Sequence, residues 1–352
     1  MAEPHIEVIS LPVSPNPYQG QIAAAVKPHG VNVRMMPSMP TPDWLRQNVG
    51  RVHILHLHWL YGIYMARYRT PLRLAAFLQR LSLARRLGYR IVWTAHNILP
   101  HRTELQPLHN AIRAYMMRSA DAVIVHCRFG EEELRRRYER QGPMWVIPIG
   151  NMTGLFPITM NAAEARAALG LRPEQFVYLF LGLLAPYKGL DLLLEAFSNI
   201  AGAEDALVIA GASLDSDVSV QVQSAAQADS RILAHLAHVP DEDMQRYLLT
   251  GDALVAPYRK VLTSGTAILG LSYGLPLITP RLGCLPETIP SDAGILYDPV
   301  SPTGLQQAMI AIKAQDPTQM RASALAGAER LNWEAIGRQT VAVYRSCLEQ
   351  RE

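Results

Sequence analysis

The feature that most constrains the fold is a regular alternation, met twice along the chain, of short β-rich runs with longer segments of helical pattern. Short apolar runs separated by helices of about ten to fifteen residues are typical of βαβ units, in which helices cover a parallel sheet. The expected strands span residues 5–11, 31–36, 52–58, 90–96, 122–127 and 145–149 in the first half, and 176–181, 206–210, 232–236, 253–256, 276–279 and 294–296 in the second. The sequence therefore predicts an α/β protein with two Rossmann-like, doubly wound parallel-sheet domains facing each other across a cleft.

The expected break between these domains lies in residues 150–161, where Gly, Pro, Asn and Thr cluster and no periodicity holds. We take residues 1–155 as the first domain and 156–332 as the second. The chain has 352 residues, more than one hydrophobic core usually serves. The last segment, residues 333–352, is an amphipathic helix that can pack on either domain, including a return to the first.

Composition excludes several classes of protein. The chain is 49% apolar and 18% charged with three cysteines, which excludes a disordered chain, a fibrous repeat and a disulfide-rich miniprotein. The apolar stretches 176–186 and 267–279 are shorter than the about 20 residues that a membrane-spanning helix needs. The N-terminus lacks the basic region and apolar core of a signal peptide. We therefore expect a cytoplasmic protein.

Charge is divided unequally between the two halves. Residues 1–150 hold 19 Lys/Arg and 9 Asp/Glu, a net of +10, whereas residues 151–352 hold 14 and 21, a net of −7. One helical pattern combines leucines with Arg67, Arg69, Arg73, Arg80, Arg85 and Arg86. This pattern is typical either of a helix that lies in an anionic membrane interface or of a helix that packs on the core and exposes a basic face to solvent. The imbalance of the whole half favours a contact with a polyanion or a peripheral contact with the inner face of the cell membrane. A nucleic-acid partner is disfavoured, because these arginines accompany leucines rather than exposed aromatic residues.

The first candidate site residue is Lys188, in the segment F-L-G-L-L-A-P-Y-K-G-L-D-L-L-L-E-A-F. A buried strand ends at a turn through Gly182, and Lys188 stands just before an amphipathic helix. Gly182 permits close approach of the backbone, and a lysine at the carboxyl end of a strand is well placed to neutralise a phosphate. A surface lysine beside an ordinary turn fits the same letters, so this pattern alone leaves both interpretations open.

A second pattern, Thr263-Ser264-Gly265-Thr266, precedes an apolar helix. Its hydroxyls and free backbone N–H groups gather at the positive end of the helix, where anions bind. An ordinary N-cap accounts for one such turn, but two in one half, each after an expected parallel strand, favour a diphosphate. The chain contains no P-loop, and its first half has no G-x-G-x-x-G, which weighs against a dinucleotide dehydrogenase.

Histidines and aromatic side chains gather at the ends of two expected strands of the first half. They are His56, His58 and Trp59 after one strand, and His96, Asn97 and His101 after the other. Such strand ends are where ligands of α/β proteins bind. His56 and His58 share one strand face, so a metal pair is an alternative, but no Asp, Glu or Cys joins them at ligand spacing and we expect no metal. His96 is the preferred polar contact to a substrate, against a capping histidine as the alternative.

Taken together, these segments resemble a family 4 glycosyltransferase of the GT-B fold. The ordered set is N-P-Y-Q, V-H-I-L-H-L-H-W, W-T-A-H-N-I-L-P-H, A-D-A-V-I-V-H, G-L-L-A-P-Y-K-G, H-V-P-D-E-D-M, L-V-A-P-Y-R, T-S-G and G-L-P-L-I-T-P-R-L-G-C-L-P-E. The resemblance implies transfer of a sugar, with retention of anomeric configuration, from a nucleotide-sugar on the C-terminal domain to an acceptor on the N-terminal one. The variant motifs resemble bacterial enzymes of exopolysaccharide assembly, whose acceptors are often polyprenyl-diphosphate-linked sugars.

The resemblance also implies a role for each matching position. Lys188 is expected to hold the donor diphosphate, with the backbone amides of residues 263–266 on its other side, and His96 to contact the donor sugar or its phosphate. The other expected donor contacts are Gly20, Gly182, His238, Val239, Tyr258, Thr263, Ser264, Gly265, Thr266 and Glu287. The expected acceptor contacts are Tyr18, His58, Trp59, Asn97 and His101.

The chain departs from the family pattern at two places. The family usually carries an arginine just after the glycine or three residues beyond it, where this chain has Leu183 and Ala185. The family's pair of glutamates, which contact the donor sugar and the ribose, falls on Val261 and Leu269. We take Arg259 as a replacement for the missing cation and count it with His96 and Lys188 as the catalytic residues.

The expected reaction needs no covalent nucleophile, and no cofactor or metal besides its UDP-, GDP- or ADP-sugar donor. One rival within enzymes is an inverting transferase or an epimerase of the same fold. The rival outside enzymes is a sugar-nucleotide-binding protein that has lost turnover, which the apolar residues at positions 261 and 269 keep open.

Overall fold

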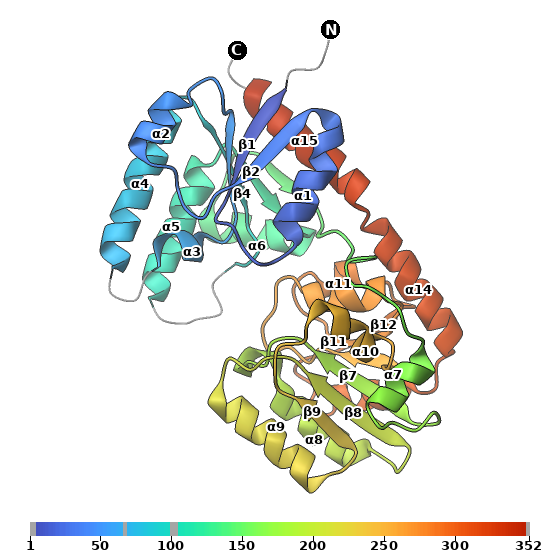
Figure 1. Ribbon diagram of the computed structural model, residues 1–352. Coiled ribbons are helices and arrows are strands. Elements are labelled where there is room, and N and C mark those ends of the chain that lie inside the picture. The colour runs from blue at the N-terminus through green and yellow to red at the C-terminus, as the bar shows by residue number, and fades with distance from the viewer. Residues whose placement is uncertain (1–4, 66–68, 99–104, 350–352) are drawn as a thin grey trace. The chain divides into compact units, whose positions relative to one another are not determined.

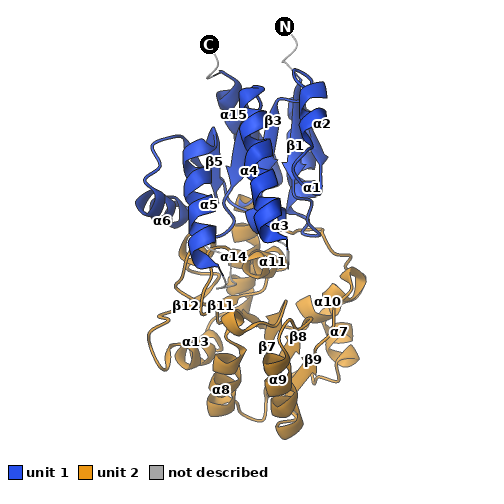
Figure 2. Cartoon of the chain, turned by 90° about the vertical axis from the view of Figure 1, so that its left-hand side faces the viewer, with its two compact units in different colours: residues 1–150, 331–352 blue, residues 151–330 orange. Residues whose placement is uncertain are grey.

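The structure is a computed structural model that describes residues 5–65, 69–98 and 105–349. The chain forms two compact units, which Figure 2 shows in different colours. Unit 1 comprises residues 1–150 and 331–352, and unit 2 comprises residues 151–330. The sequence places these limits at residues 155 and 332, and the two units divide at residues 150 and 330.

Unit 1 is built on a six-stranded parallel sheet in the order β2-β1-β3-β4-β5-β6. Val8 of the first strand is in register with Val33 on one side and Ile54 on the other. The strands are β1 (Ile6–Leu11), β2 (Val31–Met35), β3 (Ile54–Leu57), β4 (Arg90–Thr94), β5 (Ala122–Val125) and β6 (Met144–Val146). The helices are α1 (Tyr18–Val26), α2 (Pro42–Gln47), α3 (Leu60–Tyr64), α4 (Thr70–Arg86), α5 (Gln106–Ser119), α6 (Arg128–Tyr138) and α15 (Trp333–Glu349).

Two apolar cores cover the two faces of this sheet. Figure 1 shows α4 and α5 on one side of the unit 1 sheet and α1 and α15 on the other. Phe77 and Met116 belong to the first core, and Ile22 and Ile336 to the second. The last helix therefore packs on unit 1, because its amphipathic face completes the core over α1.

Unit 2 repeats the plan with the strand order β12-β11-β10-β7-β8-β9. The strands are β7 (Phe176–Leu181), β8 (Asp205–Ala210), β9 (Ile232–His235), β10 (Ala253–Val255), β11 (Leu277–Pro280) and β12 (Gly294–Tyr297). The helices are α7 (Ala162–Ala168), α8 (Leu190–Ile200), α9 (Ser216–Ala228), α10 (Met244–Leu248), α11 (Gly265–Ser272), α12 (Leu285–Thr288), α13 (Gly304–Ile312) and α14 (Pro317–Arg330). Leu193 and Met309 lie in the core on one face, and Leu248 and Ala324 in that on the other.

The predicted fold class, two doubly wound α/β domains, is confirmed, and each expected strand corresponds to one in the structure. Several strands are shorter than expected at their carboxyl ends. The run 52–58 forms a strand only over Ile54–Leu57, and the run 90–96 only over Arg90–Thr94. The apolar pattern in the sequence extends beyond the last residues that pair with a neighbouring strand. His58 and His96 therefore lie in the segments that follow β3 and β4.

The strand order indicates where each unit binds ligands. In an open parallel sheet, ligands bind at the carboxyl ends of the strands, where the order of connection reverses. In unit 2 this switch point lies between β7 and β10, and in unit 1 between β1 and β3. The segments that follow these four strands contain Lys188, residues 257–266, Tyr18 and His58.

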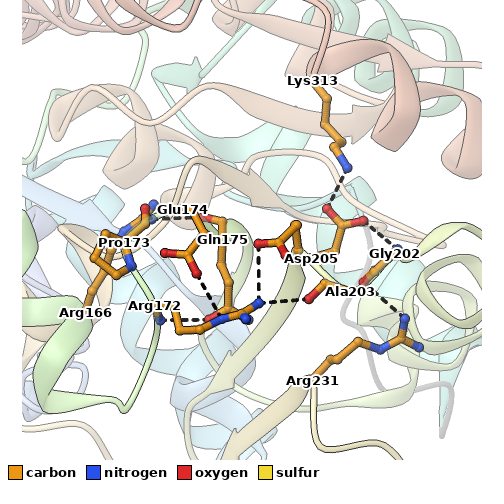
Figure 3. Close-up of polar contacts among 11 residues, drawn as sticks. Arg166, Arg172, Pro173, Glu174, Gln175, Gly202, Ala203, Asp205, Arg231 and Lys313 are labelled. Atoms are coloured by element: carbon orange, nitrogen blue, oxygen red, sulfur yellow. Dashed lines mark hydrogen bonds and ion pairs between the residues drawn. The ribbon is translucent and has the colours of Figure 1, made fainter.

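Ion pairs connect residues at the amino ends of the unit 2 strands, the ends opposite to the switch point, as Figure 3 shows. Lys313 Nζ lies 2.6 Å from Oδ1 of Asp205, the first residue of β8. Arg172 pairs with Glu174 and Glu204 and donates to the Ala203 carbonyl oxygen. These contacts tie the amino ends of the strands, away from the switch point, so we regard them as structural.

Candidate active site

Lys188 of unit 2 lies in the single 3₁₀ turn Pro186–Lys188 that precedes α8. Its Nζ is 3.4 Å from the Tyr258 hydroxyl and 4.7 Å from the centre of that ring. No described residue forms an ion pair with Lys188. Its positive charge is therefore uncompensated at the carboxyl end of the central strands.

The loops after β7 and β10 meet backbone to backbone beside Lys188. Gly189 has a φ of +71°, and a Cβ there would lie 2.0 Å from the Pro257 carbonyl oxygen. Gly182 has a φ of +131°, and a Cβ there would lie 3.3 Å from Thr266 Oγ1. Any larger residue at position 189 would push the two loops apart, so this glycine keeps Lys188 against Tyr258.

The N-terminus of α11 lies next to the same lysine. Ser264 caps this helix by accepting a hydrogen bond from the Ala267 amide at 3.0 Å, and its Oγ is 2.7 Å from the Tyr258 hydroxyl. The amides of Gly265 and Thr266 have no acceptor among the described residues, as expected for a first helical turn. Lys188, Tyr258 and the helix N-terminus thus form one continuous set of donors suited to an anion.

Arg259 is engaged differently from the expectation of a free cation. Its guanidinium is ion-paired with Asp191 in the first turn of α8, and its amide donates to the Tyr187 carbonyl oxygen at 2.9 Å. Both charged side chains are nearly half exposed. The arginine lies one residue from Tyr258, but its charge is already matched by a carboxylate.

The other expected donor contacts are distributed around this edge. His238 is exposed after β9, the neighbouring Val239 is buried, and Glu287 is exposed on the short helix α12. Leu269 lies in the core of unit 2 and Val261 packs against it, so neither position offers a polar group. Gly20 belongs to unit 1, in the first turn of α1, where a Cβ would meet nothing within 4 Å.

In unit 1 the histidines of neighbouring strands form one buried cluster. His58 and His96 are 2% and 8% exposed, and His126, which follows β5, is 5% exposed. His126 Nδ1 donates to the Ile147 carbonyl oxygen at 2.9 Å, and its Nε2 is 3.0 Å from His96 Nδ1. His96 Nε2 in turn is 3.2 Å from His58 Nδ1. The three rings form an unbroken chain of hydrogen bonds.

His56 lies beside this chain, with its ring 4.2 Å from that of His58. Its Nε2 contacts Thr94 Oγ1 at 2.7 Å, and its Nδ1 contacts the Tyr344 hydroxyl of α15 at 2.8 Å. Both ring nitrogens are therefore committed to hydroxyl groups, which leaves no lone pair for the metal pair considered from the sequence. Among the described residues, no group of three or more metal-ligating side chains is suitably arranged.

Burial keeps all four imidazoles neutral at ordinary pH. Desolvation lowers the pKa of His56 to about 3 and that of His126 to about 4. Desolvation, and then the neighbouring imidazoles, lower the pKa values of His58 and His96 well below 6.5. These histidines are therefore polar groups without charge, and they are weak bases at pH 7.

The remaining expected acceptor contacts surround the cluster. The ring of Trp59 stacks on His96 at 4.4 Å, and Tyr18 meets His96 edge-on at 5.0 Å. Asn97 is half-buried directly after His96. His101, like Arg67, lies outside the described residues. Tyr18, His58, Trp59 and His96 are thus brought together, although they come from three separate segments.

Sequence reasoning missed His126, Thr94 and Tyr344. His126 stands in the same motif position as His58 and His96, after an expected buried strand, and that repetition was the available signal. No pattern in the sequence links Asp191 to Arg259, and only the structure reveals that Asp191 neutralises Arg259.

Family models match both halves of the chain. Residues 5–150 match the model described as Glycosyltransferase Family 4, and residues 175–315 match that described as Glycosyl transferases group 1. The curated relatives are more distant. A D-inositol 3-phosphate glycosyltransferase of Segniliparus rotundus is 26% identical over 75% of this chain and 62% of its own length. A GDP-mannose:glycolipid 4-beta-D-mannosyltransferase of Xanthomonas campestris is also 26% identical, over 79% of this chain and 75% of its own.

Solved structures resemble this protein over nearly the whole chain. Sucrose-phosphate synthase from Thermosynechococcus elongatus has a TM-score of 0.75 at 20% identity and covers 99% of this chain and 100% of its own. HepE of Anabaena, solved with UDP and glucose, has a TM-score of 0.75 at 16% identity and covers 97% and 100%. At such identities the likeness establishes the fold, which is GT-B.

The two Rossmann-like units and their likeness to solved structures define the fold class as GT-B. With a family 4 model matching its N-terminal half and a group 1 model its C-terminal half, this chain is a glycosyltransferase.

Proposed function

We propose that this protein transfers a sugar from a nucleotide-diphosphate-sugar to a glycan or lipid-linked acceptor, with retention of anomeric configuration. The observation that carries the proposal is Lys188, a cation without an acidic partner among the described residues, beside the N-terminus of α11 and at the switch point of unit 2. These are the groups that a diphosphate requires. The acceptor would bind to unit 1, beside the histidine cluster.

In the proposed step, the bond between the anomeric carbon and the diphosphate oxygen breaks and the acceptor oxygen bonds to that carbon. The acceptor hydroxyl gives its proton to the departing phosphate oxygen on the same face of the sugar. Lys188 and the amides of Gly265 and Thr266 stabilise the negative charge that grows on the leaving diphosphate. The weak basicity of the four buried imidazoles supports this route, because they are poor acceptors for a hydroxyl proton at neutral pH.

The donor is identified by binding and the stereochemistry by the product. We expect one nucleotide class among GDP-mannose, UDP-glucose and ADP-glucose to stabilise unit 2 by about 2.7 kcal/mol at a hundred times its Kd, measured as a thermal shift. GDP-mannose comes first, because a relative is named for it. An NMR spectrum of the product then shows whether the anomer is retained. Binding without transfer or hydrolysis would leave the non-catalytic binding protein as the function.

A specific observation favours inversion as the second candidate. The name of the Xanthomonas campestris relative specifies a β-D-mannosyl product. An inverted anomer in the NMR spectrum would therefore replace the retaining mechanism without changing the class of enzyme.

We further propose that the acceptor is a polyprenyl-diphosphate-linked sugar of exopolysaccharide assembly and that unit 1 approaches the membrane. Unit 1 holds 22 Lys/Arg and 12 Asp/Glu, a net of +10, and unit 2 holds 11 and 18, a net of −7. Helix α4 buries Phe77 and Leu81, exposes Arg73 and Arg85, and leaves Leu72 72% exposed. No helix of the described residues is long and apolar enough to cross a bilayer. Co-sedimentation with phosphatidylglycerol vesicles but not phosphatidylcholine vesicles would support surface contact; equal binding would contradict it.

The ion pair between Arg259 and Asp191 leads to paired predictions for the donor site. If Arg259 exchanges Asp191 for the diphosphate, Arg259→Ala raises the Kd of the bound nucleoside diphosphate about tenfold, a loss of about 1.4 kcal/mol for a half-exposed contact. Asp191→Asn releases the arginine and lowers that Kd. Both are measured by calorimetry.

Arg172→Ala is the matched control, because Arg172 is a similarly exposed arginine, paired with Glu174 and Glu204 at the opposite edge of the same unit (Figure 3). It is expected to leave nucleotide affinity unchanged. An unchanged Kd in Arg259→Ala would remove Arg259 from the site.

A further inference from the structure

The histidine chain of unit 1 begins at a group that can only accept a hydrogen bond. The Ile147 carbonyl oxygen receives the bond from His126 Nδ1 at 2.9 Å, so that nitrogen carries a hydrogen. Burial lowers the pKa of His126 to about 4, so the ring is neutral and its Nε2 is a lone pair. Any group bonded to that nitrogen must donate.

This condition passes along the chain. His96 Nδ1, 3.0 Å from His126 Nε2, must carry the hydrogen, which leaves His96 Nε2 as a lone pair. His58 Nδ1, 3.2 Å from His96 Nε2, must then donate in turn. All three rings are therefore the tautomer with hydrogen on Nδ1, and the polarity of the chain is set by one backbone carbonyl.

The open end of the chain is His58 Nε2. No described residue hydrogen-bonds to this nitrogen. It lies directly after β3, beside the switch point of unit 1, where ligands of parallel sheets bind. His58 Nε2 could donate only if the buried ring became protonated and charged, or if all three histidines changed to the other tautomer. The site therefore presents an obligate hydrogen-bond acceptor.

We propose that His58 Nε2 accepts a hydrogen bond from a hydroxyl group of the sugar acceptor, and that His126 is the positioning residue that sets this polarity. The identity of the ligand as a sugar acceptor rests on the proposed function; the polarity of the chain does not. A site that accepts from a hydroxyl discriminates against a substrate that has an ether or keto oxygen in its place, since two lone pairs then face each other. The histidine cluster thus favours an acceptor that presents a hydroxyl group to His58 Nε2.

The polarity is tested by NMR on the whole protein labelled with ¹⁵N-histidine at pH 7.5. Long-range ¹H–¹⁵N correlation distinguishes a protonated ring nitrogen from a bare one, and single substitutions assign the signals. We expect hydrogen on Nδ1 in His58, His96 and His126. Hydrogen on Nε2 in any of the three would overturn the proposal.

The role of His126 is tested by two variants read by the same spectrum. His126→Gln keeps an amide oxygen that can accept from His96 and is expected to preserve the tautomer of His58. His126→Leu removes the acceptor, and His58 is expected to shift toward hydrogen on Nε2. A purely structural His126 would lower stability in the leucine variant without changing the tautomer of His58. The control is His56→Gln, because His56 packs on His58 but lies outside the chain.

The hydroxyl contact is tested with water as the acceptor, in hydrolysis of the nucleotide-sugar that stabilises the protein. His58→Phe is expected to slow hydrolysis at least tenfold with no change in donor Kd. His58→Gln is expected to slow hydrolysis less than His58→Phe does. Unchanged hydrolysis in His58→Phe would overturn the contact. If no nucleotide-sugar binds, the proposed function fails, whereas the NMR result still decides the polarity.

Discussion

Replacing Lys188 by alanine is expected to lower turnover of the nucleotide-sugar by several hundred-fold or more. The loss corresponds to about 4 kcal/mol of charge-assisted stabilisation of the leaving diphosphate. Lys188 Nζ lies 3.4 Å from the Tyr258 hydroxyl, which links it to the N-cap Ser264 of α11. Because no described carboxylate pairs with this lysine, its charge is available to a phosphate without first breaking a bond.

The matched control for this prediction is Lys313→Ala. Lys313 also lies over an aromatic ring, at 5.7 Å from Phe176, but it is paired with the buried Asp205 at the opposite edge of the sheet. We expect that variant to lose stability and to keep its turnover per folded molecule. Lys188→Arg retains the charge and should lose much less than Lys188→Ala. A loss below tenfold in Lys188→Ala would argue against a role for the lysine in charge stabilisation.

The second large effect expected is the loss of unit 1 in mild acid. Burial holds the pKa values of His56, His58, His96 and His126 far below the 6.5 of the unfolded chain. Below pH 6.5 the unfolded state therefore binds more protons than the folded state, so the free energy of unfolding falls as the pH falls. Where the unfolded imidazole is protonated and the folded one neutral, each histidine contributes about 1.4 kcal/mol per pH unit, so the four together contribute about 5.6 kcal/mol per pH unit. The stability that the four neutral histidines contribute is fully present above pH 6.5 and is lost progressively as the pH falls toward 4.

Tryptophan fluorescence reports this unfolding selectively, because all five tryptophans, at positions 44, 59, 93, 145 and 333, belong to unit 1. The measurement is a urea titration at pH 7.5, 6.5 and 5.5. We expect the free energy of unfolding to fall steeply between the last two, and His56→Gln to reduce the slope by about a quarter. Equal stability at pH 7.5 and 5.5 would contradict neutral burial of the cluster.

Local patterns along the chain were sufficient to predict that Lys188 and the N-terminus of α11 lie at the same end of the unit 2 sheet. The lysine before α8 and the capping serine before α11 each follow a short apolar strand, and parallel strands bring their carboxyl ends to one edge. Because β7 and β10 are neighbouring strands, the segments that follow them lie side by side and bring Lys188 next to Tyr258. The pairing of Arg259 with Asp191 did not follow, because the outward face of a helix gives no sign of which loop passes over it.

The histidine cluster was predicted only in part. Its members follow β3, β4 and β5, and the hydroxyl that binds His56 comes from Tyr344 in α15. Periodicity marks each strand end separately, but it does not say which histidine nitrogen faces which neighbour. That depends on the strand order and on the register between neighbouring strands, which are properties of the assembled sheet.

By itself the sequence determined that the chain forms two parallel α/β units, because strand and helix periods are local and each apolar run had to be buried on both faces. It also determined the unequal charge of the units and the residue types at the strand ends. Only the tertiary structure decided that the last helix packs on unit 1, that Arg259 is neutralised by Asp191, and that three imidazoles form a chain of single polarity. These outcomes depend on contacts between segments far apart in the chain, where a hydrogen bond or an ion pair requires distances that no local pattern encodes.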